Sequence, residues 1–418
     1  MVGKFNVDII KDDLVQFTQK LVRIPSVSGQ EKEVAQTIFN ELVEAGLTET
    51  WIDEIGNVIS VIRAEGKGPD VMLNGHMDVV PAGRIEEWRH EPFGATIDEN
   101  GIIYGRGTAD MKGGLASLIF AMKLLKKNVD RGMKLPGNII FSAVVFEEAA
   151  EMFGMEHLCQ KTLPEKGLTY DVCFLAEPTN GHINLGHRGK VEMVIQTFGK
   201  TAHSSRPWQG INALEKMLPV LNQIFTEISP NLPSHPELGQ CSITVTNCIC
   251  RPGTMSIVPD ECEISVDRRY LPSETLESIQ SDFETLLEKL HQQDNSFDAK
   301  VRVRTYVEKS YTGLKKEVQK YHPVWLMEKD HPMVVATQEA LSKVGLPAEI
   351  GYFTGGVDGA MTAGLLNIPT IGYSGADESL AHTYKEHTSI KTLLQDVEAY
   401  LAIIGNLFEL DISQFVFE

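Results

Sequence analysis

Apolar and polar positions alternate with two different periods along the chain. Residues 12–24 and 31–46 carry apolar side chains at a spacing of three to four, which predicts two amphipathic helices interrupted by "PSVSGQ". Apolar runs typical of strands follow at residues 57–64, 70–80, 138–146 and 172–179, and a helical period covers about residues 113–127. Strands that alternate with helices predict an α/β layer fold.

The middle of the chain has a different pattern. Residues 189–204, 241–250 and 261–270 alternate apolar and polar positions, as half-exposed antiparallel strands do. Helical patterns at 211–228 and 275–293 complete a β-α-β-β-α-β order, which predicts a split βαβ unit. The α/β pattern resumes after about residue 315. We therefore expect one domain, residues 1–186 and 316–418, interrupted by an α+β domain at 187–315.

Composition narrows the function. The 418 residues carry a formal net charge of −19, which argues against a nucleic-acid partner. No run approaches the roughly 20 apolar residues of a membrane span, and the N-terminus has no apolar signal core, so we expect a cytoplasmic protein without a membrane partner. The six cysteines form no C-x-x-C pair, and Cys248-Ile-Cys250 is tighter than the usual zinc spacing. They are interpreted as reduced thiols.

Candidate chemistry gathers where apolar runs end. Acidic residues and histidines follow five such runs: His76 and Asp78, Asp110 after a Gly-rich turn, Glu147 and Glu148, Glu177, and His382. In open α/β sheets, functional groups collect at the carboxyl ends of strands. These side chains are therefore expected in one crevice.

The residue types in this set suit divalent metals. Imidazole and carboxylate groups bind zinc, with cobalt or manganese as substitutes. A dinuclear site needs a bridging carboxylate and terminal ligands on each side. His76, Asp110, Glu148, Glu177 and His382 supply five ligands, which leaves one carboxylate to act as a base on water.

Taken singly, these residues have ordinary explanations. A histidine after a strand is commonly structural, and adjacent glutamates commonly begin a solvated helix. Glu151 is interpreted as such a helix-start acid. The prediction of a metal site therefore rests on the five endings occurring together in one order.

The chain resembles the M20 family of metallopeptidases and deacylases, which includes acetylornithine deacetylase, succinyl-diaminopimelate desuccinylase, aminoacylase-1 and the glutamate carboxypeptidases. The resemblance rests on "GHMDVVP", "GRGTADMKGG", "FEEAAEMFG" and "AEPT". The run "DRRYLPSET" is similar to a branch of selenium-metabolism-linked hydrolases. The family implies a zinc-peptidase-like catalytic domain with a mixed central sheet flanked by helices, and a ferredoxin-like lid that mediates dimerisation.

The resemblance also implies a role for each site residue. His76 and Glu177 would hold one metal, and Glu148 and His382 the second. Asp110 would bridge both, and its peptide bond to Met111 would be cis. The general base would be Glu147, and Asp78 would orient His76.

In the lid, the resemblance assigns substrate contacts. His203 would reach a neighbouring active site and bind the reacting carbonyl, although on its own it is a polar residue at a strand end. Asn247 and Arg268 would contact the substrate, Arg268 through its carboxylate. Arg269 competes for that role, since adjacent strand residues face opposite ways.

These implications predict a dinuclear metal-dependent amidohydrolase that acts on a small N-acyl amino acid and forms a homodimer. A dipeptidase or carboxypeptidase is the alternative, and a catalytically silent metal-binding or scaffold protein is a third. Position 177 separates the first two in part, because Glu there tends to accompany deacylases and carboxypeptidases, whereas Asp tends to accompany aminopeptidases.

Overall fold

The computed structural model describes residues 6–149, 151–410 and 415–416. Two compact units divide the chain. The first holds residues up to 186, 307–316 and 326 onward, and the second holds 187–306 and 317–325. We expected the inserted domain to end at residue 315. In the structure, residues 307–316 belong to the first unit, and residues 317–325 return to the second unit, where β18 (Tyr321–His322) pairs with one of its strands. Four short strands lie where the chain passes between units: β9 (Gly186–His187), β16 (Thr305–Lys309), β17 (Lys315–Gln319) and β19 (Trp325–Leu326).

The first unit is built on an eight-stranded sheet. Its order is β1 (Thr50–Ile52), β2 (Val58–Ile62), β6 (Ile139–Val144), β3 (Val71–His76), β7 (Val172–Leu175), β21 (Thr370–Gly372), β8 (Ile183–Asn184) and β20 (Ile350–Gly351). β1 and β2 pair antiparallel, whereas β6, β3, β7 and β21 run parallel. A smaller sheet joins β4 (Thr96–Ile97), β5 (Ile102–Tyr104) and β22 (His387–Ser389). The predicted α/β fold with a mixed central sheet is confirmed.

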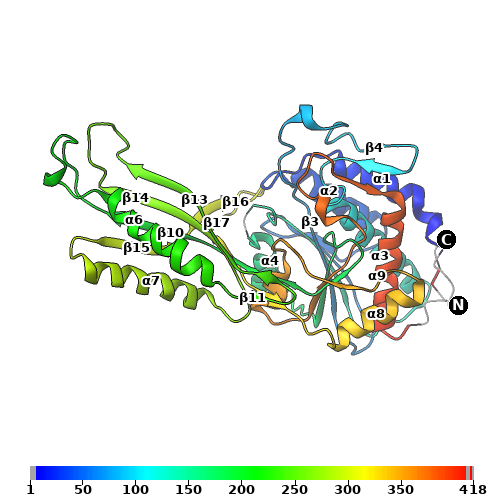
Figure 1. Cartoon of the computed structure of the whole chain (residues 1–418). Coiled ribbons are helices and arrows are strands. Elements are labelled where there is room, and N and C mark those ends of the chain that lie inside the picture. The colour runs from blue at the N-terminus through cyan, green and yellow to red at the C-terminus, as the bar shows by residue number, and fades with distance from the viewer. Residues whose placement is uncertain (1–5, 150, 411–414, 417–418) are drawn as a thin grey trace. The chain divides into compact units, whose positions relative to one another are not determined.

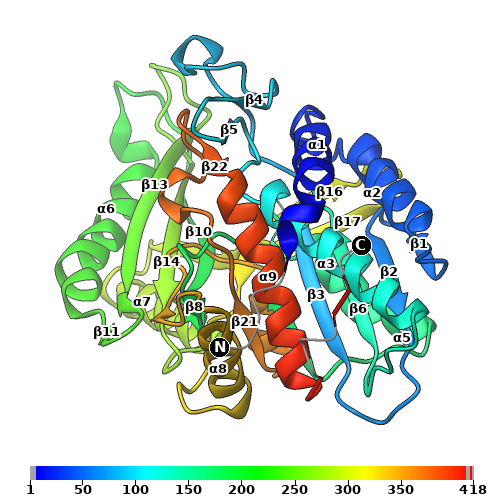
Figure 2. The same cartoon turned by 90° about the vertical axis from the view of Figure 1, so that its right-hand side faces the viewer.

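Helices flank the central sheet. They are α1 (Lys11–Val22), α2 (Lys32–Glu44), α3 (Lys112–Asp130), α4 (Phe153–His157), α5 (Leu163–Glu165), α8 (Pro332–Val344) and α9 (Ile390–Leu407). Helix α3 packs against β3 and β6, and also against α1 and α9 (Figure 2). Every residue of β3 and β6 is buried, as expected for parallel strands covered on both faces.

Parallel pairing brings the chemistry to one edge of this sheet. Val71 of β3 lies opposite Ile139 of β6 and Val172 of β7, so the three strands advance together. Their carboxyl ends therefore reach the same edge, where ligands bind in open α/β sheets.

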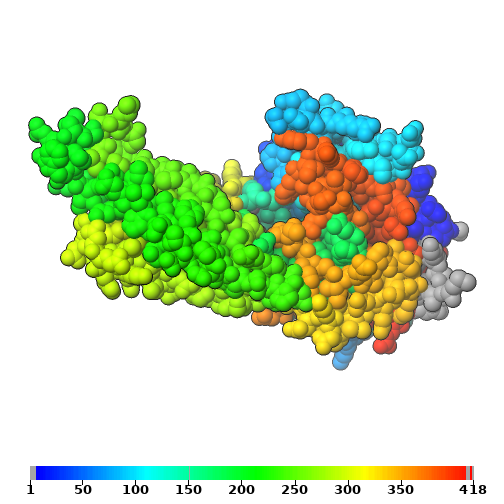
Figure 3. Space-filling view, in the orientation of Figure 1, coloured from blue at the N-terminus to red at the C-terminus, as the bar shows by residue number. Residues whose placement is uncertain are grey.

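The second unit has an antiparallel sheet in the order β13 (Ser242–Arg251), β14 (Glu261–Tyr270), β10 (Gly189–Phe198) and β15 (Asp298–Val303), with β18 beside β10. Helices α6 (Ala213–Gln223) and α7 (Leu276–Gln293) lie on one face of this sheet (Figure 1), and the space-filling view shows part of both helices at the surface (Figure 3). A two-stranded pair, β11 (Ser234–His235) with β12 (Gly239–Gln240), lies between α6 and β13 in sequence. This is the β-α-β-β-α-β arrangement expected from the sequence.

The apolar core of the second unit lies between this sheet and its two helices. Val191, Ile264 and Val266 of the sheet belong to one buried cluster with Met217 of α6 and Phe283 of α7. Alternate strand residues therefore face the helices, and the residues between them face away.

His322 in β18 makes the second unit sensitive to acid. Its ring is buried, and neither nitrogen has a hydrogen-bond partner among the described residues. Burial lowers the pKa of His322 well below its usual value, and His187 and Lys190 act in the same direction. As the pH is lowered through about 6.5, the unfolded chain takes up a proton at His322 that the folded chain does not. The free energy of unfolding therefore decreases as the pH is lowered below that value.

Between pH 6.5 and 5.5, His322 is expected to cost about 1 kcal/mol of stability. Urea unfolding at the two pH values would measure this loss. His322→Phe should reduce it, whereas His235→Asn, a partly exposed position in the same unit, should leave it unchanged. An unaltered pH dependence in His322→Phe would contradict the assignment.

In the described part of the chain, no helix is both long and apolar enough to cross a bilayer.

Candidate metal centre

His76 is the last residue of β3 and is 1% exposed. Its Nδ1–H donates to the backbone carbonyl of Asp78 over 2.9 Å. That bond leaves Nε2 facing Asp110 Oδ1 at 3.0 Å and Glu177 Oε1 at 3.6 Å. The Asp78 carboxylate lies 3.6 Å from Nδ1. Asp78 thus contacts the ring through its main-chain carbonyl and, at longer range, through its carboxylate, and its role in orienting His76 stays a prediction.

The Asp78 carboxylate holds the segment that follows β6. Its two oxygens accept the backbone N–H groups of Glu147 and Glu148, each at 3.1 Å, and the Ser28 hydroxyl at 2.6 Å. Glu31 accepts the preceding N–H, that of Phe146, at 3.3 Å. Burial raises the pKa of Glu31 to about 8, and the Asp78 charge adds to the effect. Two buried carboxylates thus fix the backbone that presents Glu147 and Glu148.

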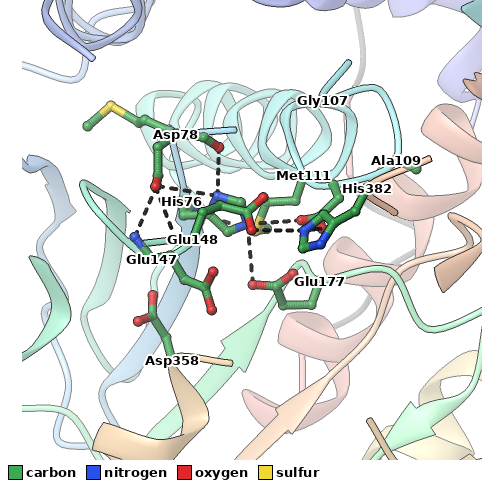
Figure 4. A network of polar contacts seen from close by, with 12 residues as sticks. His76, Asp78, Gly107, Ala109, Met111, Glu147, Glu148, Glu177, Asp358 and His382 are labelled. Atoms are coloured by element: carbon green, nitrogen blue, oxygen red, sulfur yellow. Dashed lines mark hydrogen bonds and ion pairs between the residues drawn. The ribbon is translucent and has the colours of Figure 1, made fainter. Parts of the chain in front are cut away.

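Asp110 lies between the two histidines with one oxygen toward each. Oδ1 is 3.0 Å from His76 Nε2, and Oδ2 is 3.2 Å from His382 Nε2. His382 Nε2 is also 2.9 Å from Glu148 Oε2. The peptide bond between Asp110 and Met111 is cis, as the resemblance implies. One carboxylate oxygen of Asp110 therefore faces each histidine. Figure 4 shows His76, Glu148 and His382 in this part of the structure.

Glu386 fixes the loop that presents Asp110. Its Oε1 accepts the backbone N–H groups of Gly107, Ala109 and Asp110 at 2.8, 3.1 and 3.1 Å. Arg106 Nη1 donates to Oε2 at 2.5 Å. Sequence reasoning missed this positioning residue, although it lies four residues after His382 in "HTYKEH". Burial raises the pKa of Glu386 to about 7, against the pull of Arg106.

Glu147, Glu177 and Asp358 converge on one space beside His76 (Figure 4). Asn74 Nδ2 donates to Asp358 Oδ2 at 3.0 Å, whereas Oδ1 is buried with no hydrogen-bond partner among the described residues. Burial raises the pKa of Asp358 to about 6 and raises those of Glu147 and Glu177 well above their usual values. Asp358 was visible in the sequence only as a member of the loop "FTGGVDGAMTAG".

Glu151 differs from its interpretation as a helix-start acid. It is 5% exposed and precedes Met152, the N-cap of α4. It is therefore a buried turn residue outside the first helical turn.

The titrating groups of the centre shift one another. Although burial opposes it, the carboxylates of Glu177 and Asp110 raise the pKa of His76 well above its usual value. Hydrogen bonds to Asp110 and Glu148 raise the pKa of His382 to about 10. Conversely, His382 and His76 outweigh burial and lower the pKa of Asp110. Imidazole charge thus partly neutralises the carboxylates.

The donor set fits divalent cations. Two groups of three side chains each have ligand atoms within 4.8 Å of one another. The first group is His76, Glu147 and Glu177, and the second is His76, Asp110 and Glu148. Glu148 Oε1 is buried with no hydrogen-bond partner among the described residues. Crowded buried carboxylates are costly unless a cation compensates them. Nitrogen and oxygen donors of this kind suit zinc, cobalt or manganese.

A cavity of about 240 Å³ opens onto these residues. Its wall includes Asp110, Glu147, Glu148, Glu177, Phe353, Thr354, Glu378, Ala381 and His382. A small molecule placed there would lie against the proposed ligands and the proposed base.

The lid residues belong to the second unit. The exposed His203 accepts the Ser205 N–H at Nδ1 over 3.1 Å, which in the neutral ring leaves the hydrogen on Nε2. Asn247 is exposed on β13 opposite Ser265, where the register of the strand pair shifts.

Arg268 lies elsewhere than its predicted substrate role requires. It is 4% exposed, and its guanidinium pairs with Glu274. It faces the buried Val191 and Ile243 across the neighbouring strands, so its side chain belongs to the helix-covered face. Arg269 is more exposed and pairs with Asp267 at 2.9 Å.

Comparisons with known proteins find related sequences and a related fold. The family model described as Peptidase family M20/M25/M40 matches residues 72–406. YgeY of Escherichia coli strain K12 is 32% identical over 395 residues, which cover 94% of this chain and 93% of YgeY. Succinyl-diaminopimelate desuccinylase of Legionella pneumophila strain Corby is 29% identical over 276 residues, covering 64% of this chain and 71% of that enzyme.

A solved structure shares the fold. The Bacillus subtilis YXEP protein, described as a dinuclear metal binding peptidase from the M20 family, superposes with a TM-score of 0.67 at 18% identity. The match covers 96% of this chain and 99% of that one.

Proposed function

The chain belongs to peptidase family M20/M25/M40 and is a metal-dependent hydrolase of amide or peptide bonds, and from this premise we propose that it cleaves the amide bond of an N-acyl amino acid. The observation that carries the proposal is the position of Asp110 between His76 and His382, with Glu147 close to His76. This arrangement supplies metal ligands and a base to the same cavity.

Two divalent ions per subunit, most simply zinc, would be held by these side chains. His76 and Glu177 would bind one ion, Glu148 and His382 would bind the other, and Asp110 would bind both. When bound, the ions supply Lewis acidity that polarises the scissile carbonyl and activates water.

Glu147 is the residue proposed to move the proton. Burial and the neighbouring Glu177 and Glu148 charges raise its pKa, although His76 opposes the shift. It would accept a proton from the attacking water and deliver it to the leaving nitrogen. The backbone N–H of Glu147 donates to the Asp78 carboxylate, and this bond restricts the positions open to the Glu147 side chain.

His203 is proposed to donate its Nε2–H to the carbonyl oxygen as negative charge develops there. The Ser205 N–H bond supports this role because it places the hydrogen on Nε2. In the proposal, His203 comes from the second copy of a homodimer formed through the second unit. Asn247 would contact the substrate. Arg268 is buried and pairs with Glu274, whereas Arg269 pairs with Asp267 but is more exposed, which favours Arg269 as the residue that would take a substrate carboxylate.

A substrate panel would test the assignment. Zinc-loaded protein should hydrolyse N-acetyl or N-succinyl amino acids at least tenfold faster than dipeptides, measured as release of free amine. The similarity to a desuccinylase and the Glu at position 177 favour this order. The reverse order would favour the dipeptidase or carboxypeptidase. If no member of the panel is hydrolysed with two metals bound, the result would favour the silent metal-binding protein.

The cytoplasmic location stays a prediction.

A further inference from the structure

Three cysteines converge at one end of the sheet in the second unit. Cys248 and Cys250 are two residues apart on β13 and therefore share a face. Cys262 on β14 lies directly opposite Cys250 in the strand register. Cys262 Sγ is 3.9 Å from Cys248 Sγ and 3.4 Å from Cys250 Sγ, and all three sulfurs lie within 4.8 Å of one another.

The cluster is graded in exposure. Cys262 is fully buried in the core between the sheet and its helices, Cys250 is partly buried against that core, and Cys248 is exposed. All three are free thiols. Solute therefore has a route to the cluster through Cys248, while Cys262 anchors it in the fold.

Two of the three sulfur separations are close to those of a three-coordinate thiolate site, and the third, between Cys248 and Cys250, is within 4.8 Å. With a thiolate-to-metal bond of about 2.3 Å, three sulfurs arranged trigonally around one ion lie ~4.0 Å apart. The observed 3.9 Å meets this spacing, and the 3.4 Å contact needs only a small side-chain adjustment. Among the described residues, the ligand atoms of this group are the three cysteine sulfurs, with no nitrogen or oxygen ligand.

The donors select the class of ion. Structural zinc takes four ligands, and the imidazole and carboxylate donors of the first unit suit harder divalent ions. Three thiolates without nitrogen or oxygen suit a soft ion such as Cu(I). The two sets of ligands in this chain therefore differ in chemistry.

We propose that Cys248, Cys250 and Cys262 bind one soft, thiophilic ion of the Cu(I) class in the second unit. Each thiol loses its proton to solvent as its sulfur-to-metal bond forms, and no electron is transferred. The bound ion ties the edge strand β13 to β14. Binding to the folded chain alone therefore raises its stability.

Competition for Cu(I) under anaerobic conditions tests the site. The reduced, zinc-loaded full chain is titrated into the coloured Cu(I) complex of bicinchoninate, and loss of colour reports transfer of the ion. We expect one Cu(I) withdrawn per chain and a rise in melting temperature. Cys248→Ser and Cys250→Ser should each weaken transfer at least tenfold. Cys248 is exposed, so its replacement does not disturb the core.

Cys241→Ser is the matched control, because Cys241 precedes β13 in the same unit and its Sγ contacts Glu274 at 3.3 Å, outside the cluster. It should transfer Cu(I) like the unmodified chain. Failure to withdraw Cu(I), or equal withdrawal by Cys248→Ser, would overturn the proposal. The proposal would also be overturned if air oxidised Cys250 and Cys262 to a disulfide and the reduced chain bound no Cu(I).

Discussion

Glu147→Gln is expected to lower turnover of the preferred substrate by about 10³-fold while both metals stay bound. Gln cannot accept a proton from water, and general acid–base catalysis typically contributes 10²–10⁴-fold. The substitution keeps the size of the side chain and leaves the backbone N–H that Asp78 accepts. The loss should therefore appear in kcat, with little change in KM or in metal content.

The control for this variant lines the same cavity. Glu378 faces the pocket, but its carboxylate accepts the backbone N–H and the hydroxyl of Thr354. Glu378→Gln should keep turnover within a few fold. Near-normal turnover of metal-loaded Glu147→Gln would show that another group moves the proton, and Asp358 would be the next candidate.

Asp110→Asn is expected to release metal as well as activity. The carboxylate points one oxygen toward each histidine, and an amide offers one oxygen and a nitrogen that binds metal poorly. Metal analysis after gel filtration should find one zinc or fewer per chain, compared with two for the unmodified chain. Turnover should fall by at least about 10³-fold, since two ions act jointly on the attacking and leaving groups.

Asp98→Asn provides the comparison, because Asp98 accepts turn N–H groups from Asn100 and Ile102 away from the centre. This variant should retain two zinc ions. Two tightly bound zinc ions in Asp110→Asn would exclude the bridging role.

The sequence predicted the site through a topological rule. The apolar runs before His76, Glu147 and Glu177 are β3, β6 and β7, and their parallel pairing brings the carboxyl ends to one edge. Because that rule concerns which strand end a residue follows, it could place side chains without knowing how they contact one another.

Positioning contacts were beyond the reach of that rule. Glu386 holds Gly107 and Ala109 from more than 270 residues away in the chain. The Asp78 carboxylate, expected beside His76, also accepts the backbone N–H groups of the two glutamates. Such bonds depend on the paths of loops, which hydrophobic period does not encode.

Strand register decided two further points. It places Arg268 on the helix-covered face, although the sequence alone left Arg268 and Arg269 as neighbours on opposite faces. It also places Cys262 opposite Cys250, so that a cysteine distant in sequence completes a cluster that spacing along the chain does not reveal. Register depends on the turn and the bulge between strands, which the sequence pattern fixes poorly.

The discontinuous first unit has a consequence for biosynthesis. A ribosome makes His76, Asp110, Glu148 and Glu177 before the whole of β10–β15, and makes His382 and Glu386 after it. The four main strands of the second unit are therefore made while the candidate metal centre still lacks His382. It also lacks Glu386, which accepts the backbone N–H of Asp110. A nascent chain at that stage carries the crowded acids with His76 but without His382, so we expect full metal loading to wait until the segment with His382 and Glu386 has been made.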